Sequence, residues 1–368
     1  MRIKTITCHD VYNHGASLQA FALQEYLSTL GHDVEIINYK PNYLSQHYKF
    51  CKVSPGFQKN IVVKILYILA KLPSRLLARK RKRCFDKFNT KYLKLTKRYS
   101  SNEELKADVP LADVYIVGSD QVWNPIFENG RDPAFFLDFV PANKEKVAYA
   151  ASFAVEVIST EVEDLIKPML KNIDRISVRE NSGITILQKI GIRNASVVLD
   201  PVFLLSIDEW RKLFDCKKKK RKYILVYTFE ISIEMTNFIK HVAKERGLNI
   251  YSVNANKCNF ATRSFQNYGP DEFLNLIHNA ELVITNSFHA TAFSLIFCKD
   301  FFVFERKLLN SRMSDLLKDL NIENCIREGD DWNKLSNYKI NYKSVTIKLQ
   351  NKINLSKSYL NECMKEEI

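Results

Sequence analysis

Polar residues close to position 289 have the types and spacing that anion binding and proton transfer require. In the segment 283–291 (VITNSFHAT), an apolar run predicts a strand that stops where a new apolar helix begins. Ser287, His289 and Thr291 then fall at a helix N-terminus on the carboxyl end of a strand, just after Asn286. Exposed N–H groups and the helix dipole favour a phosphate or carboxylate there, and His289 would add a proton donor. A plain helix cap with a packing histidine fits the same spacing.

A second strand-to-loop junction follows the apolar run 114–117. Gly118 permits close approach of the backbone, and Asp120, Gln121 and Asn124 could bind hydroxyl groups or handle a proton. A purely structural turn is the alternative interpretation.

Arg179 and Glu180 follow a predicted strand at 175–178. The planar fork of an arginine can clamp a carboxylate or a phosphate, although an ordinary Arg–Glu surface pair explains the fragment equally well. Arg312, with Asn310 close before it, opens a predicted helix and could line a cleft or only begin that helix.

The first strand-to-helix connection contains Asn13, Gly15 and Gln19, at a place where a ligand-binding loop is expected. It has no GxGxxG pattern, and no GxxxxGK[ST] occurs anywhere in the chain. The histidines are dispersed and neither HExxH nor CxxC is present. We therefore expect no nucleotide cofactor and no metal site.

The elements that must position these residues alternate between strands and helices. The pattern begins with a strand at 3–7, a helix at 17–30 and a strand at 34–39, and the same alternation starts again at 223. It predicts an α/β protein with two Rossmann-like domains that face each other across a cleft. The predicted ranges are an N-terminal domain at 1–215, a C-terminal domain at 223–335 and a helical tail at 336–368, with the boundary at the basic run 217–222.

The composition fits a globular chain whose positive charge is concentrated in one insertion. The 368 residues are 46% hydrophobic and carry a net charge of +14. Fourteen Lys or Arg and a single acidic residue lie within 59–98. We expect a basic helical insertion at 57–99, broken at Pro73. It could lie on an anionic membrane or form a solvated helical hairpin; nucleic acid could use the same charge, but we expect no such partner.

The N-terminal residues lack the apolar core of a secretory leader, and no apolar run approaches the roughly 20 residues that span a bilayer. We expect a cytoplasmic protein with reduced thiols. If the insertion docks on a membrane, the protein would be peripheral on the inner face of the plasma membrane.

Five segments, in order across about residues 1–325, resemble the polysaccharide pyruvyl transferase family. The insertion and the tail carry little of this resemblance. The segments are Gly15–Gln24 (GASLQAFALQ), Gly118–Asn124 (GSDQVWN), Ser177–Glu180 (SVRE), Leu199–Val202 (LDPV) and Thr285–Ser294 (TNSFHATAFS).

The resemblance implies two Rossmann-like domains in a glycosyltransferase-B-like arrangement. It also implies transfer of the enolpyruvyl carbons of phosphoenolpyruvate to a sugar as a cyclic ketal, with release of phosphate. Carried over to this chain, it places His289 and Arg179 at the donor site. Relatives often have an arginine two residues before the histidine, where this chain has Ser287, so Arg312 or Arg263 is expected to complete the phosphate clamp.

That chemistry needs an acid, a base and anion donors, and no redox cofactor. Our hypothesis is that His289 is the acid, that Arg179 and the helix start at 287–291 hold the donor, and that Asp120 or Glu180 deprotonates the acceptor. The acceptor would be a lipid-linked polysaccharide precursor if the insertion docks on a membrane. A nucleotide-sugar glycosyltransferase and a non-catalytic glycan-binding relative are the alternatives.

Overall fold

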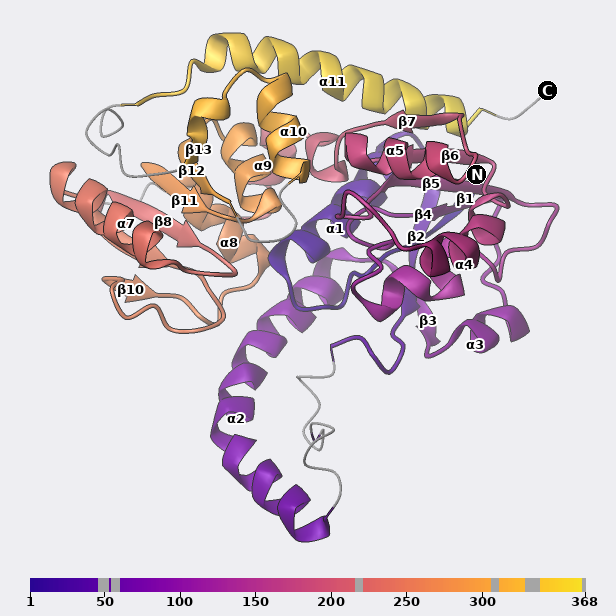
Figure 1. Cartoon of the computed structure of the whole chain (residues 1–368), viewed down its shortest axis with the longest axis horizontal. Coiled ribbons are helices and arrows are strands. Elements are labelled where there is room, and N and C mark those ends of the chain that lie inside the picture. Colours follow the sequence, from indigo (N-terminus) through magenta and orange to yellow (C-terminus); the bar gives the residue numbers. More distant parts are fainter. Residues whose placement is uncertain (46–52, 54–59, 216–220, 306–310, 328–337, 366–368) are drawn as a thin grey trace.

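The chain is described here from a computed structural model, shown in Figure 1. The residues that the structure describes are 1–45, 53, 60–215, 221–305, 311–327 and 338–365.

The first half of the chain builds a parallel sheet of seven strands in the order β3-β2-β1-β4-β5-β6-β7. The chain moves outward from β1 to β3 and then returns to place β4 on the other side of β1. The carboxyl ends of β1 and β4 therefore flank the point where the strand order reverses, which is where ligands bind in such sheets. The strands are β1 (Arg2–Ile6), β2 (Asp33–Tyr39), β3 (Leu95–Tyr99), β4 (Val114–Val117), β5 (Glu145–Ala151), β6 (Arg175–Val178) and β7 (Ala195–Val197).

Helices connect these strands. The first one starts three residues earlier than the sequence pattern predicts, because the side chain of Asn13 accepts hydrogen bonds from the N–H groups of Gly15 and Ala16. The connecting helices are α1 (His14–Thr29), α2 (Ile61–Tyr92), α3 (Asn102–Ala107), α4 (Thr160–Leu170), α5 (Asn181–Lys189) and α6 (Ile207–Arg211).

The second half repeats the same topology in a parallel sheet of six strands, ordered β10-β9-β8-β11-β12-β13. Its reversal point lies between β8 and β11, so the predicted pair of Rossmann-like units is confirmed. Its elements are β8 (Tyr223–Tyr227), α7 (Ile233–Glu245), β9 (Asn249–Ser252), β10 (Arg263–Ser264), α8 (Pro270–His278), β11 (Leu282–Thr285), α9 (Phe288–Ile296), β12 (Asp300–Phe304), α10 (Ser311–Asp319) and β13 (Ile326–Arg327).

One apolar cluster spans both halves, and each half has a further cluster of its own. Trp210, at the end of the first half, packs edge-on against Phe293 of α9 with 4.9 Å between ring centroids, and against Phe21 of α1 at 5.7 Å. The last helix, α11 (Tyr342–Cys363), also joins the halves, as Figure 1 shows. The hydroxyl of Tyr342 donates to the carbonyl of Ser294, whereas Ser356 accepts a hydrogen bond from the N–H of Leu199.

The basic insertion differs from our expectation. Pro73 does not break it: α2 runs as one helix of 32 residues, and Pro73 lies inside it. Pro73 is exposed, so a bend at this position disturbs no packed neighbour. The end of the predicted insertion also contributes β3, the edge strand of the first sheet. None of the described helices is long and apolar enough to cross a bilayer.

Candidate functional site

A cavity of about 580 Å³ lies between the two halves. Its walls come from the loops that follow β1, β4, β8 and β11, so both reversal points open into it. Among the residues that the structure describes, those that line the cavity are Cys8, Val11, Asn13, Tyr43, Leu44, Ser45, Asp120, Gln121, Ile126, Phe127, Glu128, Asn129, Phe229, Asn286, Ser287, Phe288, His289 and Met313.

The start of α9 forms one wall. Ser287 caps the helix, because its Oγ accepts from the N–H of Ala290. The side chain of Asn286 ties the β8 loop to this wall by accepting from the N–H of Phe229 at 2.8 Å. Thr291 is fully buried and donates to the carbonyl of Ser287, so it stabilises the helix start and does not line the cavity.

The start of α1 forms the facing wall, with its cap Asn13 in the lining. Gly15 lies directly against the imidazole of His289: a Cβ atom built on Gly15 would stand 2.0 Å from Nδ1. Gln19 lies deeper. Its amide donates to Oγ1 of Thr7 at 2.9 Å and its carbonyl oxygen accepts from the N–H of Ser119 at 3.1 Å, so it joins the loops after β1 and β4.

The loop after β4 approaches the backbone of β5 at Gly118. Its φ of +117° and the carbonyl of Tyr149, 2.1 Å from where a Cβ would lie, both require glycine. Asp120, two residues later, enters the cavity wall beside Gln121. Gln121 accepts a hydrogen bond from Asn124 at 2.7 Å, and Asn124 itself is fully buried and holds the loop.

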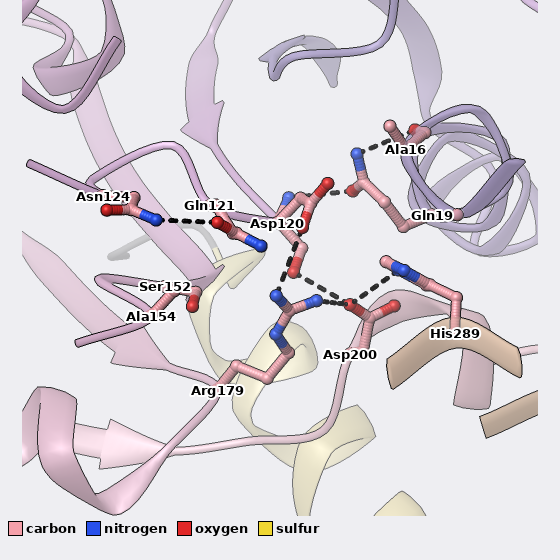
Figure 2. A network of polar contacts seen from close by, with 12 residues as sticks. Ala16, Gln19, Asp120, Gln121, Asn124, Ser152, Ala154, Arg179, Asp200 and His289 are labelled. Carbon is pink, nitrogen blue, oxygen red and sulfur yellow. Dashed lines mark hydrogen bonds and ion pairs between the residues drawn. The ribbon is translucent and has the colours of Figure 1, made fainter. Parts of the chain in front are cut away.

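Arg179 joins two carboxylates behind this wall (Figure 2). Its guanidinium donates to Oδ1 of Asp120 at 3.2 Å and to Oδ2 of Asp200, and it lies 4.5 Å from the ring centroid of Phe288. Nε2 of His289 lies 3.5 Å from the same Oδ2 of Asp200. One chain of charged groups therefore connects His289 of the second half with Asp120 of the first.

The charges around Asp200, the central member of this set of charged groups, keep its carboxylate ionised. Burial raises the pKa of Asp200, but the charges of Arg179 and His289 and the hydrogen bonds to the carboxylate outweigh burial, so the pKa lies well below its usual range. Burial lowers the pKa of Arg179, whereas Asp200 and Asp120 raise it, and the net shift is upward. Asp200 is therefore a fixed negative charge against the imidazole.

The structure gives some predicted site residues other partners. The side chain of Arg179 is only 2% exposed and does not line the cavity, because both carboxylates cover its guanidinium. Glu180 is fully buried and accepts from the hydroxyl of Ser152 and the N–H of Ala154, away from the cavity. Arg263 is exposed on β10, the strand at the far edge of the second sheet.

Two predicted positions fall outside the description. Arg312 belongs to α10, but its side chain is not among those described, and Asn310 lies in the gap at 306–310.

Two residues of the site were not among the predicted site residues. Asp200 connects Arg179 with His289, and Phe288 covers the guanidinium from the other half. For Asp200, the sequence offered one indication: the pair Asp200-Pro201 directly follows a predicted strand. A cation–π contact between residues 109 positions apart has no local signature, so Phe288 could not have been paired with Arg179 from the sequence.

The arrangement has the parts for acid–base chemistry on an anionic substrate. The N-terminal ends of α1 and α9 meet at one cavity, where helix dipoles and backbone N–H groups favour negative charge. His289 can exchange a proton there, while a carboxylate holds the other side of its ring. Asp120 supplies a carboxylate that lines the cavity itself.

Comparison with known proteins gives one family. The sequence profile described as polysaccharide pyruvyl transferase matches residues 13–307. None of the curated protein sequences compared matches the chain.

Solved structures with low sequence identity resemble the chain as a whole. A UDP-GlcNAc 2-epimerase of Methanocaldococcus jannaschii, in complex with UDP-GlcNAc and UDP, has a TM-score of 0.48 at 14% identity, covering 96% of this chain and 94% of its own. The UDP-GlcNAc 2-epimerase of Neisseria meningitidis has a TM-score of 0.46 at 10% identity, covering 100% and 95%. A spinosyn rhamnosyltransferase has a TM-score of 0.48 at 12% identity, covering 99% of both chains.

Proposed function

This chain belongs to the polysaccharide pyruvyl transferase family, and from that premise we propose that it transfers pyruvate from phosphoenolpyruvate to a sugar of a polysaccharide precursor as a cyclic ketal. The observation that carries the proposal is the connected set of His289, Asp200, Arg179 and Asp120 at the edge of the cavity between the two halves.

His289 is the acid that protonates C3 of phosphoenolpyruvate. Nε2 faces Oδ2 of Asp200 at 3.5 Å, so Nδ1 is the nitrogen that gives its proton to the substrate in this proposal. Gly15 supports this role because any larger residue would displace the ring.

The helix starts hold the anionic groups of the donor. Ser287 at the start of α9 and Asn13 at the start of α1 line the same cavity, so two positive dipole ends converge on it. Arg179, which the sequence placed on the donor itself, is instead a positioning residue in this proposal. It orients Asp120 and Asp200 through one guanidinium.

Asp120 is the base that takes a proton from the acceptor. It lines the cavity, and Arg179 holds one of its carboxylate oxygens. The cavity rim beside it exposes apolar surface from Ile126, Phe127 and Phe229, each about half exposed. Such surface suits the apolar face of a sugar ring.

The step balances without a further reactant. Protonation of C3 makes C2 cation-like, and a first sugar hydroxyl forms a bond to C2. The bond between C2 and the phosphate oxygen then breaks, phosphate leaves, and the second hydroxyl forms the second bond to C2. Of the two hydroxyl protons, one restores the proton that the acid gave to C3, and the other leaves with phosphate.

The test is product formation on a lipid-linked acceptor, which we propose as the acceptor form. The protein is incubated with phosphoenolpyruvate and extracted lipid-linked saccharides, and phosphate release is followed together with product mass. We expect phosphate release coupled to a mass gain of one pyruvate less one water. Glycosyl transfer from a UDP-sugar to the same extract, with no use of phosphoenolpyruvate, would contradict the proposal.

A further inference from the structure

We propose that the projecting half of α2 docks on an anionic bilayer surface. This inference goes beyond pyruvyl transfer, because it rests on the surface of the helix and not on the cavity. The docking segment, as we name it, is the exposed side of α2 from Ile61 to Lys87, which excludes the buried Arg81 and Phe85 at the base of the helix. Figure 1 shows its first half extending away from both sheets.

One face of the docking segment is apolar and exposed. Ile61 is 70% exposed and Leu69 is 57% exposed, and with their exposed apolar neighbours they form a contiguous patch of the kind that marks an interaction surface. Four of the exposed apolar residues are spaced by four, four and seven positions, so they share one side of the helix, whereas the exposed Val63 lies on the other side. These residues are Ile61, Ile65, Leu69 and Leu76, with Val62 and Leu66 beside them.

The same face continues into exposed basic residues. Lys80, Arg83 and Lys87 follow Leu76 at spacings of four, three and four, so they extend the stripe toward the body of the protein. Apolar side chains at the start of the segment can enter the acyl boundary, while the lysine and arginine side chains that follow can meet phosphate head groups.

The base of the helix is fixed to the catalytic body. Phe85 is buried and its ring lies 5.1 Å from that of His14 in α1. Arg81 donates to the carbonyl of Gln266 in the second half, so the helix contacts both halves. A membrane contact at the docking segment would therefore hold the cavity at a set height above the bilayer, where a lipid-linked acceptor is presented.

An anionic bilayer fits this face better than a second copy of the chain. The single acidic residue of 59–98, Asp86, already pairs with Lys82 of the same helix at 2.6 Å. A second α2 would offer no opposite charge to Lys80, Arg83 and Lys87. A nucleic acid would offer phosphates but would leave the apolar stripe in water.

The test is co-sedimentation of the full chain with vesicles, without donor or acceptor, so that it is independent of the proposed function. The vesicles are phosphatidylcholine alone and phosphatidylcholine mixed with phosphatidylglycerol. A charge variant carries Lys80→Gln, Arg83→Gln and Lys87→Gln, and an apolar variant carries Ile65→Gln and Leu69→Gln. The matched control carries Ile233→Gln, Lys240→Gln and Lys244→Gln on α7, where Ile233 is 82% exposed.

We expect the wild type and the α7 control to sediment with the mixed vesicles and much less with phosphatidylcholine alone. The charge variant should partition more than about tenfold more weakly, because each basic residue near an anionic surface contributes on the order of 1 kcal/mol. The apolar variant should also lose binding. Equal binding of all variants, or no binding of the wild type, would overturn the proposal. It would also be overturned if the wild type formed a dimer in the absence of vesicles and the apolar variant did not.

Discussion

Gly15 and His289 come from opposite halves of the chain, yet a Cβ at Gly15 would lie 2.0 Å from Nδ1 of His289. The imidazole thus packs directly on the backbone at the start of α1. Contact between these two residues joins the two halves at the edge of the cavity.

Gly15→Ala should displace the imidazole and lower turnover. A misplacement of about 1 Å near reacting groups costs on the order of 100-fold in rate, so we expect a loss of that size in kcat. The control is Gly191→Ala, at a φ of +90° with nothing within 4 Å of the added Cβ. It should lower stability but leave kcat unchanged; equal kcat for the two variants would contradict this account of Gly15.

Arg179→Lys should lower turnover although the charge is kept. A lysine ammonium is a point charge and does not reproduce the fork that reaches Asp120 and Asp200 together. Kinetics on the folded variant should show a lower kcat with a nearly unchanged KM for phosphoenolpyruvate, because Arg179 does not line the cavity. A large rise in KM with normal kcat would instead place Arg179 on the donor.

Asp200→Asn should change how stability depends on acid. The pKa of Asp200 is held below its ordinary value of 3.8 in the folded protein, so the ionised carboxylate stabilises the fold above that value. This contribution is lost as pH falls through the folded pKa. Denaturant unfolding should therefore show that the free energy of unfolding falls less steeply with acid for Asp200→Asn than for the wild type. The variant should also be less stable at neutral pH, because Arg179 loses a buried partner. Identical slopes would contradict the assigned shift.

His14→Gln should flatten the pH dependence of stability below neutral pH. Burial, and then the charge of Arg81, lower the pKa of His14 well below 6.5, so the folded protein keeps the ring neutral. The unfolded chain takes up a proton as pH falls below that value, and stability then drops by at most about 1.4 kcal/mol per pH unit. The free energy of unfolding of the wild type, of His14→Gln and of a His241→Gln control is measured at several pH values. If it depends on pH equally in His14→Gln and the wild type, the buried neutral state of His14 is contradicted.

Much of the fold was predictable because it depends on local patterns. Apolar runs punctuated by Gly, Asn and Pro placed most strands and helices near their observed positions, and the repeated alternation predicted two Rossmann-like units. Pro73 misled the interpretation of α2, because a proline on an exposed helix bends it and does not end it. Very short strands such as β10 carry too few residues for a periodic signal.

The candidate site was predictable in part. Polar residues after strand ends marked Asp120 and the start of α9, and both line the cavity. The partners of Arg179 could not be predicted, because Asp200 and Phe288 reach it through the packing of whole elements. Glu180 is fully buried and lies outside the cavity, and its burial could not be predicted from the four-residue segment Ser177–Glu180.

The central claim is that phosphoenolpyruvate binds in the cavity beside His289. The most direct measurement is a thermal unfolding titration with phosphoenolpyruvate on the wild type and His289→Ala, with inorganic phosphate and UDP-sugars as comparisons. A ligand at 100 times its dissociation constant stabilises the native state by about 2.7 kcal/mol, which moves the melting temperature measurably. We predict stabilisation by phosphoenolpyruvate that His289→Ala weakens; stabilisation by a UDP-sugar and none by phosphoenolpyruvate would contradict the account.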